Sequence, residues 1–565
     1  MDFKAMLSDI LSKEIQELTK EELLLTIEIP KNADMGDFAF PCFKLSKAYR
    51  KAPNMIAQDL AEKITLTEAF DKVEVAGGYL NFFVNRKYFA QEIIGEIINR
   101  GDKYGSQEIG AGNVICIDFS APNVAKPFHV GHLRSTVIGN SLYRIYEFLG
   151  YNCVGINHLG DWGTQFGKVI VAYKNWGNKE EIEKEPIKTL LDLYVKFHDE
   201  AELNPELENE ARNWFVKMEK GDEEALSLWE WFSSETIKEL KKIYRLLNVE
   251  FDYYSGESFY NDKMEAILEE LKSKNLLKDS EGAVLIDLEE YNMPPCLVQK
   301  KDGSTLYATR DITAAIYRKN TFNFYKCLYV TDYSQNLHFA QWFKVIDLMG
   351  YPWAEDIIHV PFGRVSHEGR RIQTRKGNVV LLEEVMTGAV ERVKEIIGEK
   401  NPNLENKEEV AKDIGIGAVI FNDLSNNRIK DISFSWETAF SFEGETGPYV
   451  QYTHARSSSV LRKADIDVTA EINGAALTDD VTLAVLKLIQ QFPEAIIDAQ
   501  RKNEPSIITR HIIDIAQSFN RFYHDHPILV EDEEVKKARL AVVFAVKQVL
   551  KTGLYLLGIK APEKM

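Results

Sequence analysis

Two histidines three positions apart, His129 and His132, stand where a strand-like segment gives way to a helical one. Residues 113–120 (NVICIDFS) are apolar and β-branched, and the residues after His132 repeat apolar side chains at helical spacing. A helix start offers backbone N–H groups and the positive end of the helix dipole, which together bind anions. The imidazoles add donors, and Gly131 leaves room for a nucleotide near the backbone. With Lys126 close by, the segment predicts a phosphate-binding site.

The segments around this site predict a parallel β-sheet. NCVGINHLGD (152–161) is a second strand candidate, so a strand, a loop, a helix and a strand follow one another within about forty residues, which is a βαβ unit. KCLYVTDYS (326–334) and DIIHVPFGRV (356–365) add strand character further on. Residues 170–300 are charged and read as a largely helical insertion into this sheet domain.

The two ends of the chain have their own patterns. Residues 1–108 combine helical segments with a strand-like ending, KVEVAGGYLNFFVN (72–85), before a Gly-rich boundary. From 446 to the end the pattern is helical throughout. The predicted fold class is therefore α/β: a Rossmann-type parallel-sheet domain with a helical insertion (109–445), an N-terminal α+β module (1–108) and a C-terminal all-helical domain (446–565).

Composition limits the class of protein. A membrane span would need an apolar run of about 18 residues, and the sequence has none. The five cysteines lie far apart and form no CxxC pair, which argues against a structural zinc site or a disulfide framework and predicts a cytoplasmic protein. The net charge of −19 discourages nucleic-acid binding, but residues 446–565 hold 15 basic and 15 acidic side chains. A local binding face therefore stays possible at that end.

Longer motifs carry a family resemblance. HVGH (129–132) resembles the HIGH signature of class I aminoacyl-tRNA synthetases. The string SAPNVAKPFHVGHLRSTVIGN followed by INHLGDWGTQFG is similar to arginyl-tRNA synthetases specifically, and TLYATRDITAA (305–315), TRKGNVV (374–380) and SFEGETGPYVQYTHAR (441–456) extend the likeness along the chain.

The resemblance implies a two-step reaction. ATP activates L-arginine to arginyl-adenylate, and the arginyl group then passes to the 2′-hydroxyl of the terminal adenosine of tRNA-Arg. It also implies Mg²⁺ with the ATP, no structural metal, no membrane, a monomer, and activation that depends on tRNA. In the same reading, 1–108 binds the tRNA elbow, 109–445 is catalytic, and 446–565 binds the anticodon.

The resemblance assigns catalysis to the histidine pair and to loop cations. The second class I signature, KMSKS, departs here, because Thr374 stands at the position of its second lysine. We expect Lys126 to compensate, since an ammonium can serve a phosphate from either side. The expected catalytic residues are Lys126, His129, His132, Arg371, Arg375 and Lys376, and the expected ATP contacts are His129, Gly131, His132, Gly377 and Asn378.

A guanidinium substrate calls for carboxylates, which can pair with its planar fork of donors bidentately. By family match, Asp311 and Tyr307 grip the guanidinium and Asp118 adds a second acid, while Asn123 and Gln335 hold the backbone end of the amino acid. The alternative for Asp311 is a helix cap or an ion pair with Arg310.

Two groups are candidates for tRNA contact. Tyr449, Tyr452 and Arg456 share one face of a helix, which suits stacking on unpaired bases, although such tyrosines are more often part of a core. The other group is basic, and a solvated charged face is its alternative reading. That group is Lys44, Lys47, Arg50 and Lys51.

Three rival functions stay open. A class I synthetase for another amino acid would leave Asp118 and Asp311 unpaired against an apolar substrate. A catalytically silent RNA-binding paralogue has the altered RIQTRKGN loop (371–378) in its favour. A nucleotidylyltransferase with the same histidine motif would leave both flanking domains unexplained.

Overall fold

The computed structural model describes residues 3–30, 32–124, 128–280, 282–300, 306–367, 370–371, 381–434, 439–465, 467–469 and 471–565. It divides into two compact units. One unit holds 1–104, 456–492 and 514–549, and the other holds 105–455, 493–513 and 550–565. This division differs from the three predicted segments, because the helices after residue 446 each contribute to both units.

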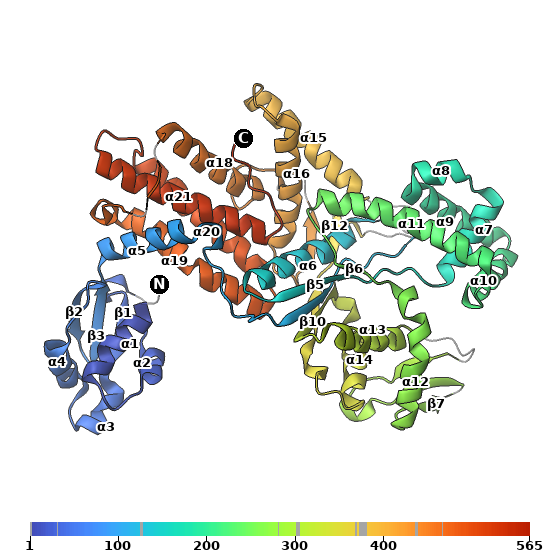
Figure 1. The fold of residues 1–565 in the computed structure, drawn as a ribbon, viewed down its shortest axis with the longest axis horizontal. Coiled ribbons are helices and arrows are strands. Elements are labelled where there is room, and N and C mark those ends of the chain that lie inside the picture. Colours follow the sequence, from blue (N-terminus) through green and yellow to red (C-terminus); the bar gives the residue numbers. More distant parts are fainter. Residues whose placement is uncertain are drawn as a thin grey trace. The chain divides into compact units, whose positions relative to one another are not determined.

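The N-terminal module is α+β, as predicted. Its three-stranded antiparallel sheet has the order β1-β3-β2, and helices cover it (Figure 1). Phe40, Leu80 and Phe82 of this sheet are fully buried. The elements are α1 (Phe3–Glu14), α2 (Lys20–Thr26), β1 (Phe38–Pro41), α3 (Ser46–Tyr49), α4 (Pro53–Lys63), β2 (Phe70–Ala76), β3 (Tyr79–Val84) and α5 (Arg86–Arg100).

The predicted parallel sheet is confirmed. Five strands pair in the order β11-β10-β4-β5-β6, and every pairing is parallel. Helix α6 lies on one side of the sheet, and α13 and α14 lie on the other (Figure 1), as right-handed crossovers in opposite directions require. The elements are β4 (Val114–Asp118), α6 (Val130–Phe148), β5 (Asn152–Asn157), β6 (Tyr253–Tyr254), α13 (Tyr307–Phe322), β10 (Lys326–Asp332), α14 (Asn336–Leu348) and β11 (Ile357–Phe362).

Apolar residues on both faces hold this sheet in register. Cys116 of β4 pairs directly with Cys327 of β10 and with Val154 of β5. Cys116, Cys327 and the neighbouring Ile117 are fully buried, as expected for a parallel strand covered on both sides. The strand order reverses beside β4, so β4 carries the position where ligands bind in sheets of this kind.

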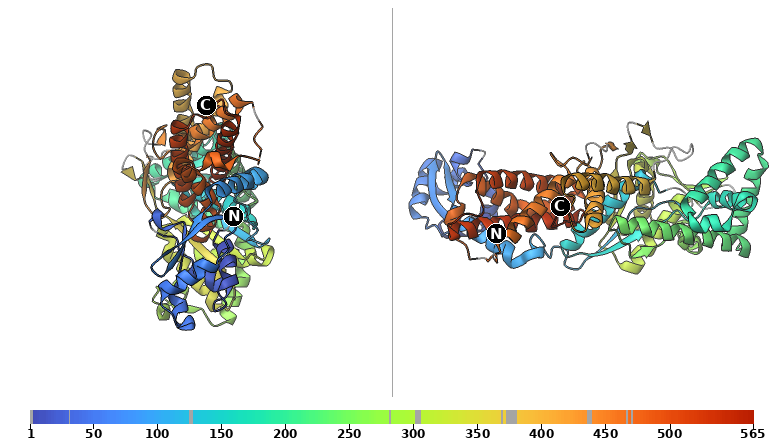
Figure 2. Two further views of the ribbon diagram at one scale, coloured as in Figure 1. Left: turned by 90° about the vertical axis from the view of Figure 1, so that its left-hand side faces the viewer. Right: turned by 90° about the horizontal axis from the view of Figure 1, so that it is seen from above.

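The insertion is largely helical, as predicted. Its first five helices form one bundle, coloured blue-green to green in Figure 2. They are α7 (Thr164–Trp176), α8 (Lys179–Lys184), α9 (Pro186–Leu203), α10 (Glu206–Glu219) and α11 (Glu223–Leu246). The rest of the insertion also contains strands, because β6 joins the main sheet and a three-stranded antiparallel sheet follows. That part contains α12 (Met264–Ser273), β7 (Lys278–Ser280), β8 (Ala283–Ile286) and β9 (Cys296–Gln299).

The remaining elements close the chain. A small sheet of order β13-β12-β14 follows the main sheet, and the C-terminal part is helical, as predicted. The described helices include none that is long and apolar enough to cross a membrane. The elements are β12 (Val365–His367), β13 (Arg370–Arg371), α15 (Leu382–Lys400), α16 (Lys407–Leu424), β14 (Ile432–Phe434), α18 (Gly447–Ala464), α19 (Asp480–Lys502), α20 (Ser506–Asp525) and α21 (Glu533–Leu556).

Candidate active site

The carboxyl ends of the parallel strands open into a cavity of about 1040 Å³. Its described lining comes from the ends of β4, β5, β10 and β11 and from the starts of α6, α13 and α14. The formally charged side chains of that lining are Asp118, Asp311, Asp332, Asp431 and Arg364. Four carboxylates against one guanidinium make the described lining negative, which favours a cationic ligand.

His129 and His132 lie together at the start of α6, with ring centroids 4.1 Å apart. His129 is the N-cap, and its Nδ1 accepts the Gly131 N–H at 3.0 Å. His132 Nδ1 accepts the His129 N–H at 3.2 Å. The prediction of N–H groups open to an anion is therefore wrong for His129 and Gly131, because the imidazoles already satisfy those groups.

These hydrogen bonds fix the form of the imidazoles. Because Nδ1 accepts in both rings, each neutral ring carries its hydrogen on Nε2. Burial lowers the pKa of His129 to about 4, so this ring is neutral near pH 7. His129 therefore offers an N–H donor, rather than a positive charge, to the cavity that it lines.

Gly131 has a structural reason to be glycine. A Cβ built there would lie 2.7 Å from Cε1 and 2.8 Å from Nδ1 of His129. The absence of a side chain lets the His129 ring fold back over the helix start and accept the Gly131 N–H. The sequence had suggested room for a nucleotide, and the structure adds room for this imidazole.

Asp311 and Tyr307 lie one turn apart in the first turns of α13, and both line the cavity. Asp311 Oδ2 lies 2.6 Å from Nε2 of His338. Arg310 instead pairs with Glu257, at 3.4 Å. The alternative reading of Asp311 as the partner of Arg310 is therefore wrong.

Asp118, the last residue of β4, also lines the cavity. Its Oδ2 lies 2.8 Å from Nη2 of Arg318, and both side chains are buried. The charge of Asp118 is thus already balanced by an arginine of the chain, which the sequence reading did not anticipate. His158, directly after β5, lines the same region, and burial lowers its pKa.

Gln335 and Asn123 were expected to hold the α-amino and carboxylate end of the arginine substrate, and the structure places only one of them in the described cavity lining. Gln335, in front of α14, lines the cavity. Asn123 is exposed and is not among the described lining residues, although its backbone bridges to Gly160 beside β5. The described cavity therefore brings together Asp118, Tyr307, Asp311 and Gln335, with the histidine pair, but not Asn123.

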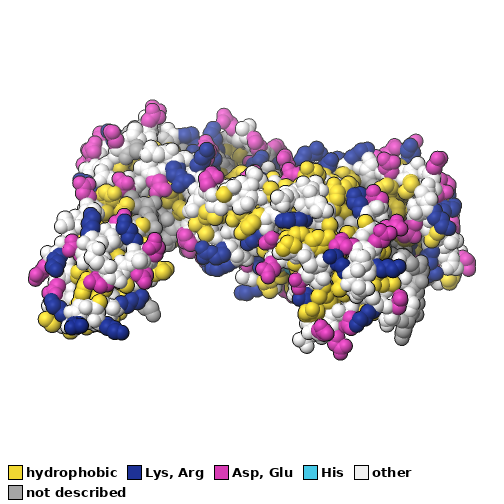
Figure 3. Space-filling view, turned by 60° about the horizontal axis from the view of Figure 1, so that its bottom comes forward, with side chains coloured by type: hydrophobic (Ala, Val, Ile, Leu, Met, Phe, Trp, Pro, Cys, Tyr) yellow, Lys and Arg dark blue, Asp and Glu magenta, His cyan; other side chains and the backbone are white. Residues whose placement is uncertain are grey.

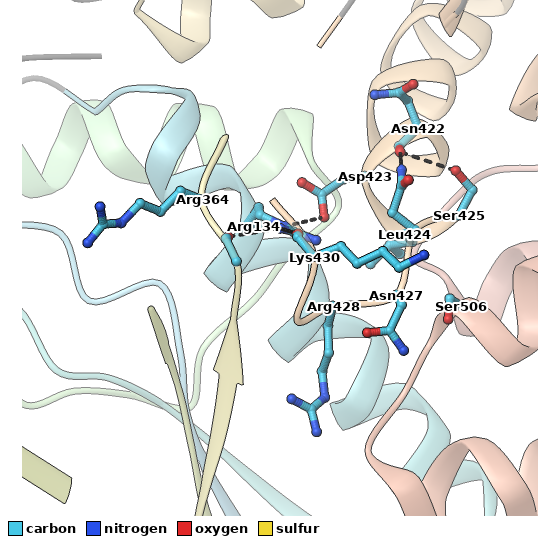
Figure 4. Close-up of polar contacts among 12 residues, drawn as sticks. Arg134, Arg364, Asn422, Asp423, Leu424, Ser425, Asn427, Arg428, Lys430 and Ser506 are labelled. Atoms are coloured by element: carbon cyan, nitrogen blue, oxygen red, sulfur yellow. Dashed lines mark hydrogen bonds and ion pairs between the residues drawn. The ribbon is translucent and has the colours of Figure 1, made fainter. Parts of the chain in front are cut away.

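A buried arginine ties the histidine helix to the sheet. Arg134, one turn after Gly131, donates from Nη1 to the carbonyls of Gly363 (2.8 Å) and Lys430 (2.7 Å). Its Nε lies 3.3 Å from Oδ1 of Asp423, and both side chains are buried (Figure 4). Gly363 directly precedes the cavity residue Arg364, so Arg134 sets the position of α6 against that wall.

Most of the expected phosphate-binding cations cannot be placed. Lys126, Arg375, Lys376, Gly377 and Asn378 lie outside the described residues, and of Arg371 only the backbone is described, in β13. The neighbouring chain does return to the site, because His129 bridges to Leu381 and the Leu382 N–H donates to the Phe128 carbonyl at 2.9 Å. The chain from Leu381 onward therefore starts next to the histidine motif.

The candidate tRNA residues of α18 differ in their exposure to solvent. On α18, Tyr452 is 40% exposed, whereas Tyr449 is half-buried. Arg456 donates to Asn520 at 2.9 Å and lies over the Tyr523 ring, so its guanidinium is held within the chain.

The N-terminal basic residues Lys44, Lys47 and Arg50 are exposed. Lys44 donates to Thr26 Oγ1 at 3.1 Å, and Lys51 pairs with Asp59. On the face in Figure 3, blue basic side chains of this module stand among magenta acidic ones. This is the pattern of a mixed charged surface rather than of a uniformly basic one.

Sequence reasoning missed the residues that hold the others in place: Arg134, His158, Arg318, His338 and Arg364. Two signals could have pointed to some of them. His158 directly follows a predicted strand, where ligands of parallel sheets bind. Arg318 stands seven residues after Asp311, which places both on one side of a helix.

The comparisons with known proteins agree with this geometry. The family model described as tRNA synthetases class I (R), catalytic domain, matches residues 93–436, that of the arginyl tRNA synthetase N terminal domain matches 4–84, and that of the DALR anticodon binding domain matches 450–565. With the parallel sheet and the histidine pair at its switch point, the fold and the site define a class I aminoacyl-tRNA synthetase.

Whole-chain relatives narrow the class. The chain is 76% identical to the arginine–tRNA ligase of Alkaliphilus metalliredigens and 56% identical to that of Clostridioides difficile, with both chains covered fully in each case. A solved arginyl-tRNA synthetase of Thermus thermophilus has the same fold, with a TM-score of 0.81 at 24% identity over both whole chains. The chain belongs to the arginyl-tRNA synthetase family.

Proposed function

We propose that L-arginine and ATP react in the described cavity to give arginyl-adenylate and pyrophosphate. The arginyl group then passes to tRNA-Arg. The observation that carries this proposal is the excess of aspartates in the described lining, four against Arg364, of which Asp118 is balanced by Arg318. Two of the aspartates, Asp118 and Asp311, line the same cavity as the neutral imidazole of His129. The two aspartates suit a cationic amino-acid side chain. The Nε2–H of His129 suits a phosphate oxygen, which accepts a hydrogen bond.

In the first step, a carboxylate oxygen of arginine attacks the α-phosphorus of ATP and pyrophosphate leaves on the opposite side. The protein must align the two reactants and stabilise charge that grows on the phosphate oxygens. His129 and His132 donate from Nε2 to the nucleotide, with Gly131, Gly377 and Asn378 as further contacts. The cations Lys126, Arg371, Arg375 and Lys376 approach the phosphates.

The arginine substrate is held at both ends. Asp118, Asp311 and Tyr307 receive the guanidinium, and Gln335 and Asn123 hold the α-amino and carboxylate end.

Mg²⁺ is expected to arrive with ATP. In the described part of the chain no three His, Cys, Asp or Glu side chains gather into a metal-holding group. Phosphate oxygens and water, which Mg²⁺ prefers to keep, fit this site better than an all-protein cage. When bound, the ion neutralises charge on the departing pyrophosphate.

In the second step, the 2′-hydroxyl of the terminal adenosine attacks the adenylate carbonyl, and AMP leaves. We assign the elbow of the tRNA to residues 1–108 with Lys44, Lys47 and Arg50, catalysis to 109–445, and the anticodon to 446–565 with Tyr449, Tyr452 and Arg456. Exposed Tyr452 is the best placed of these for stacking on a base. We further propose that the enzyme acts as a monomer in the cytoplasm.

The test uses two modified tRNA-Arg transcripts. One ends in 2′-deoxyadenosine and the other in 3′-deoxyadenosine, and each is offered with labelled arginine and Mg-ATP. We expect charging of the 3′-deoxy transcript and none of the 2′-deoxy transcript. Charging of neither, with the unmodified tRNA also uncharged, would reject the proposed function, and charging of the 2′-deoxy form alone would reject the proposed attacking group.

A further inference from the structure

Each of the two carboxylates assigned to the guanidinium already holds a donor of the chain on one oxygen. Asp118 Oδ2 lies 2.8 Å from Arg318 Nη2. Asp311 Oδ2 lies 2.6 Å from His338 Nε2. Both aspartates line the cavity. A carboxylate held in this way on one oxygen has its other oxygen, Oδ1, left for a ligand.

Arg318 depends on Asp118. Its side chain is 1% exposed, and its Nη2 lies 2.8 Å from Oδ2 of Asp118, which is itself buried. The aromatic ring of Tyr329 lies 5.4 Å from this guanidinium, so part of its surroundings is apolar. A buried charge of this kind needs its counter-ion, and the carboxylate in contact with it is Asp118.

His338 holds Asp311 from the next helix. It stands in the first turn of α14, three residues after Gln335, and its ring packs edge-on against Phe339. Both His338 and Asp311 are about a quarter exposed. The short contact between Nε2 and Oδ2 requires a hydrogen on Nε2, and it fixes the rotation of the Asp311 carboxylate.

We propose that Arg318 and His338 are positioning residues, each of which fixes one oxygen of a guanidinium-binding carboxylate. Asp118 and Asp311 then grip the substrate from two sides with one oxygen each, in place of the bidentate fork expected from the sequence. This inference rests on the proposed function and adds how the pocket reads its substrate.

The arrangement has a consequence for specificity. A planar guanidinium spans two separate oxygens, whereas the compact ammonium of lysine serves one of them. Citrulline has the shape of arginine but carries a carbonyl oxygen in place of one nitrogen, which would face a carboxylate oxygen. An unpaired buried acceptor of this kind makes rejection strong.

The first test distinguishes two roles of Asp118: binding the arginine substrate and balancing the buried charge of Arg318. ATP–pyrophosphate exchange with tRNA present gives the KM for arginine and for ATP, and the melting temperature reports folding. Asp118→Asn should lower the melting temperature and raise the arginine KM. Adding Arg318→Met removes the stranded charge, so the melting temperature should recover while the arginine KM stays raised by about tenfold or more. Recovery of both would overturn the proposal, because Asp118 would then be only the partner of Arg318.

The second test concerns His338. His338→Ala should raise the arginine KM by about tenfold and leave the ATP KM within about twofold, since one hydrogen bond to a charged group is lost. His338→Gln places an amide N–H at a similar reach, and it should bring the arginine KM back to within about threefold. An unchanged KM in the alanine variant, or a glutamine variant as poor as alanine, would overturn the role of His338.

These outcomes remain distinct from failure of the proposed function. A folded wild-type protein that exchanges with no amino acid, or not with arginine, would reject the function itself. A wild-type protein active with arginine, whose variants keep its KM, would reject only the positioning roles.

Discussion

His129 carries its hydrogen on Nε2 because its Nδ1 accepts a backbone N–H, and burial keeps the ring neutral by lowering its pKa to about 4. The ring can therefore stabilise a growing phosphate charge only as a hydrogen-bond donor. A donor of this kind loses no function between pH 6 and pH 8, in contrast to an ordinary histidine whose charge changes there.

This leads to a prediction on pH dependence. The ratio of exchange rates of wild type and His129→Asn should stay constant from pH 5.5 to pH 8, because the wild-type ring does not titrate in that window. The measurement is the exchange rate at saturating substrates across the range. A ratio that rises as pH falls through about 6.5 would mean that His129 acts as a cation.

Asp311 allows a second prediction for a single side chain. Asp311→Asn removes the negative charge but keeps the shape, so the arginine KM should rise by about 10- to 100-fold, while the ATP KM stays within about twofold. A matched control is Asp347→Asn, an exposed aspartate at the far end of α14, which should leave both KM values unchanged. An unaltered arginine KM in Asp311→Asn would remove this residue from the pocket.

Helix α6 is held in place by contacts between residues that are far apart in the sequence. Arg134 joins the helix to the carbonyls of Gly363 and Lys430 and to the buried Asp423, whose pKa burial raises. Arg134→Met would leave Asp423 buried without its partner, at a cost of about 3–5 kcal/mol. The thermal unfolding midpoint should fall accordingly, and the double change Arg134→Met with Asp423→Leu should restore much of it. Equal midpoints in the single variant and the wild type would contradict this.

The sequence predicted those elements whose signal is local. The strands at 114–118 and 152–157 and helix α6 follow from continuous apolar runs and helical periodicity. The histidine pair followed from its place between them. Within the insertion read as largely helical, the three strands of residues 278–299 were not predicted, because short polar strands such as Lys278–Ser280 carry no periodic signal.

Contacts over long sequence distances could not be predicted. Asp118 and Arg318 are two hundred residues apart and meet only because β4 pairs with β10 and α13 packs beside that pair. Family resemblance supplied Asp118, Tyr307, Asp311 and Gln335 as candidates, but it did not supply the residues that orient them. Sequence reading therefore found the groups expected to touch ligands more readily than the groups that support them.

The whole molecule should lose stability in mild acid. The pKa of His129 and of His359 is lowered to about 4, with burial as the largest cause, and that of His158 is lowered as well. The unfolded chain binds protons near pH 6.5, so folding is penalised progressively as pH falls from there to about 4.

A variant isolates one contribution to this acid sensitivity. His359 lies in β11 and hydrogen-bonds Thr331 of β10. The variant His359→Gln keeps a polar group that can reach Thr331. Its unfolding midpoint should fall less between pH 7 and pH 5 than that of the wild type. Parallel decreases in the two proteins would show that His359 is not neutral in the folded state.

The site should activate arginine and no other amino acid. The most direct measurement is ATP–pyrophosphate exchange with each of the twenty amino acids, with and without tRNA-Arg. We expect exchange with arginine alone, and only when tRNA is present. Exchange with a different amino acid would contradict the reading of Asp118 and Asp311, and no exchange in a folded protein that still binds tRNA would indicate a catalytically silent RNA-binding relative.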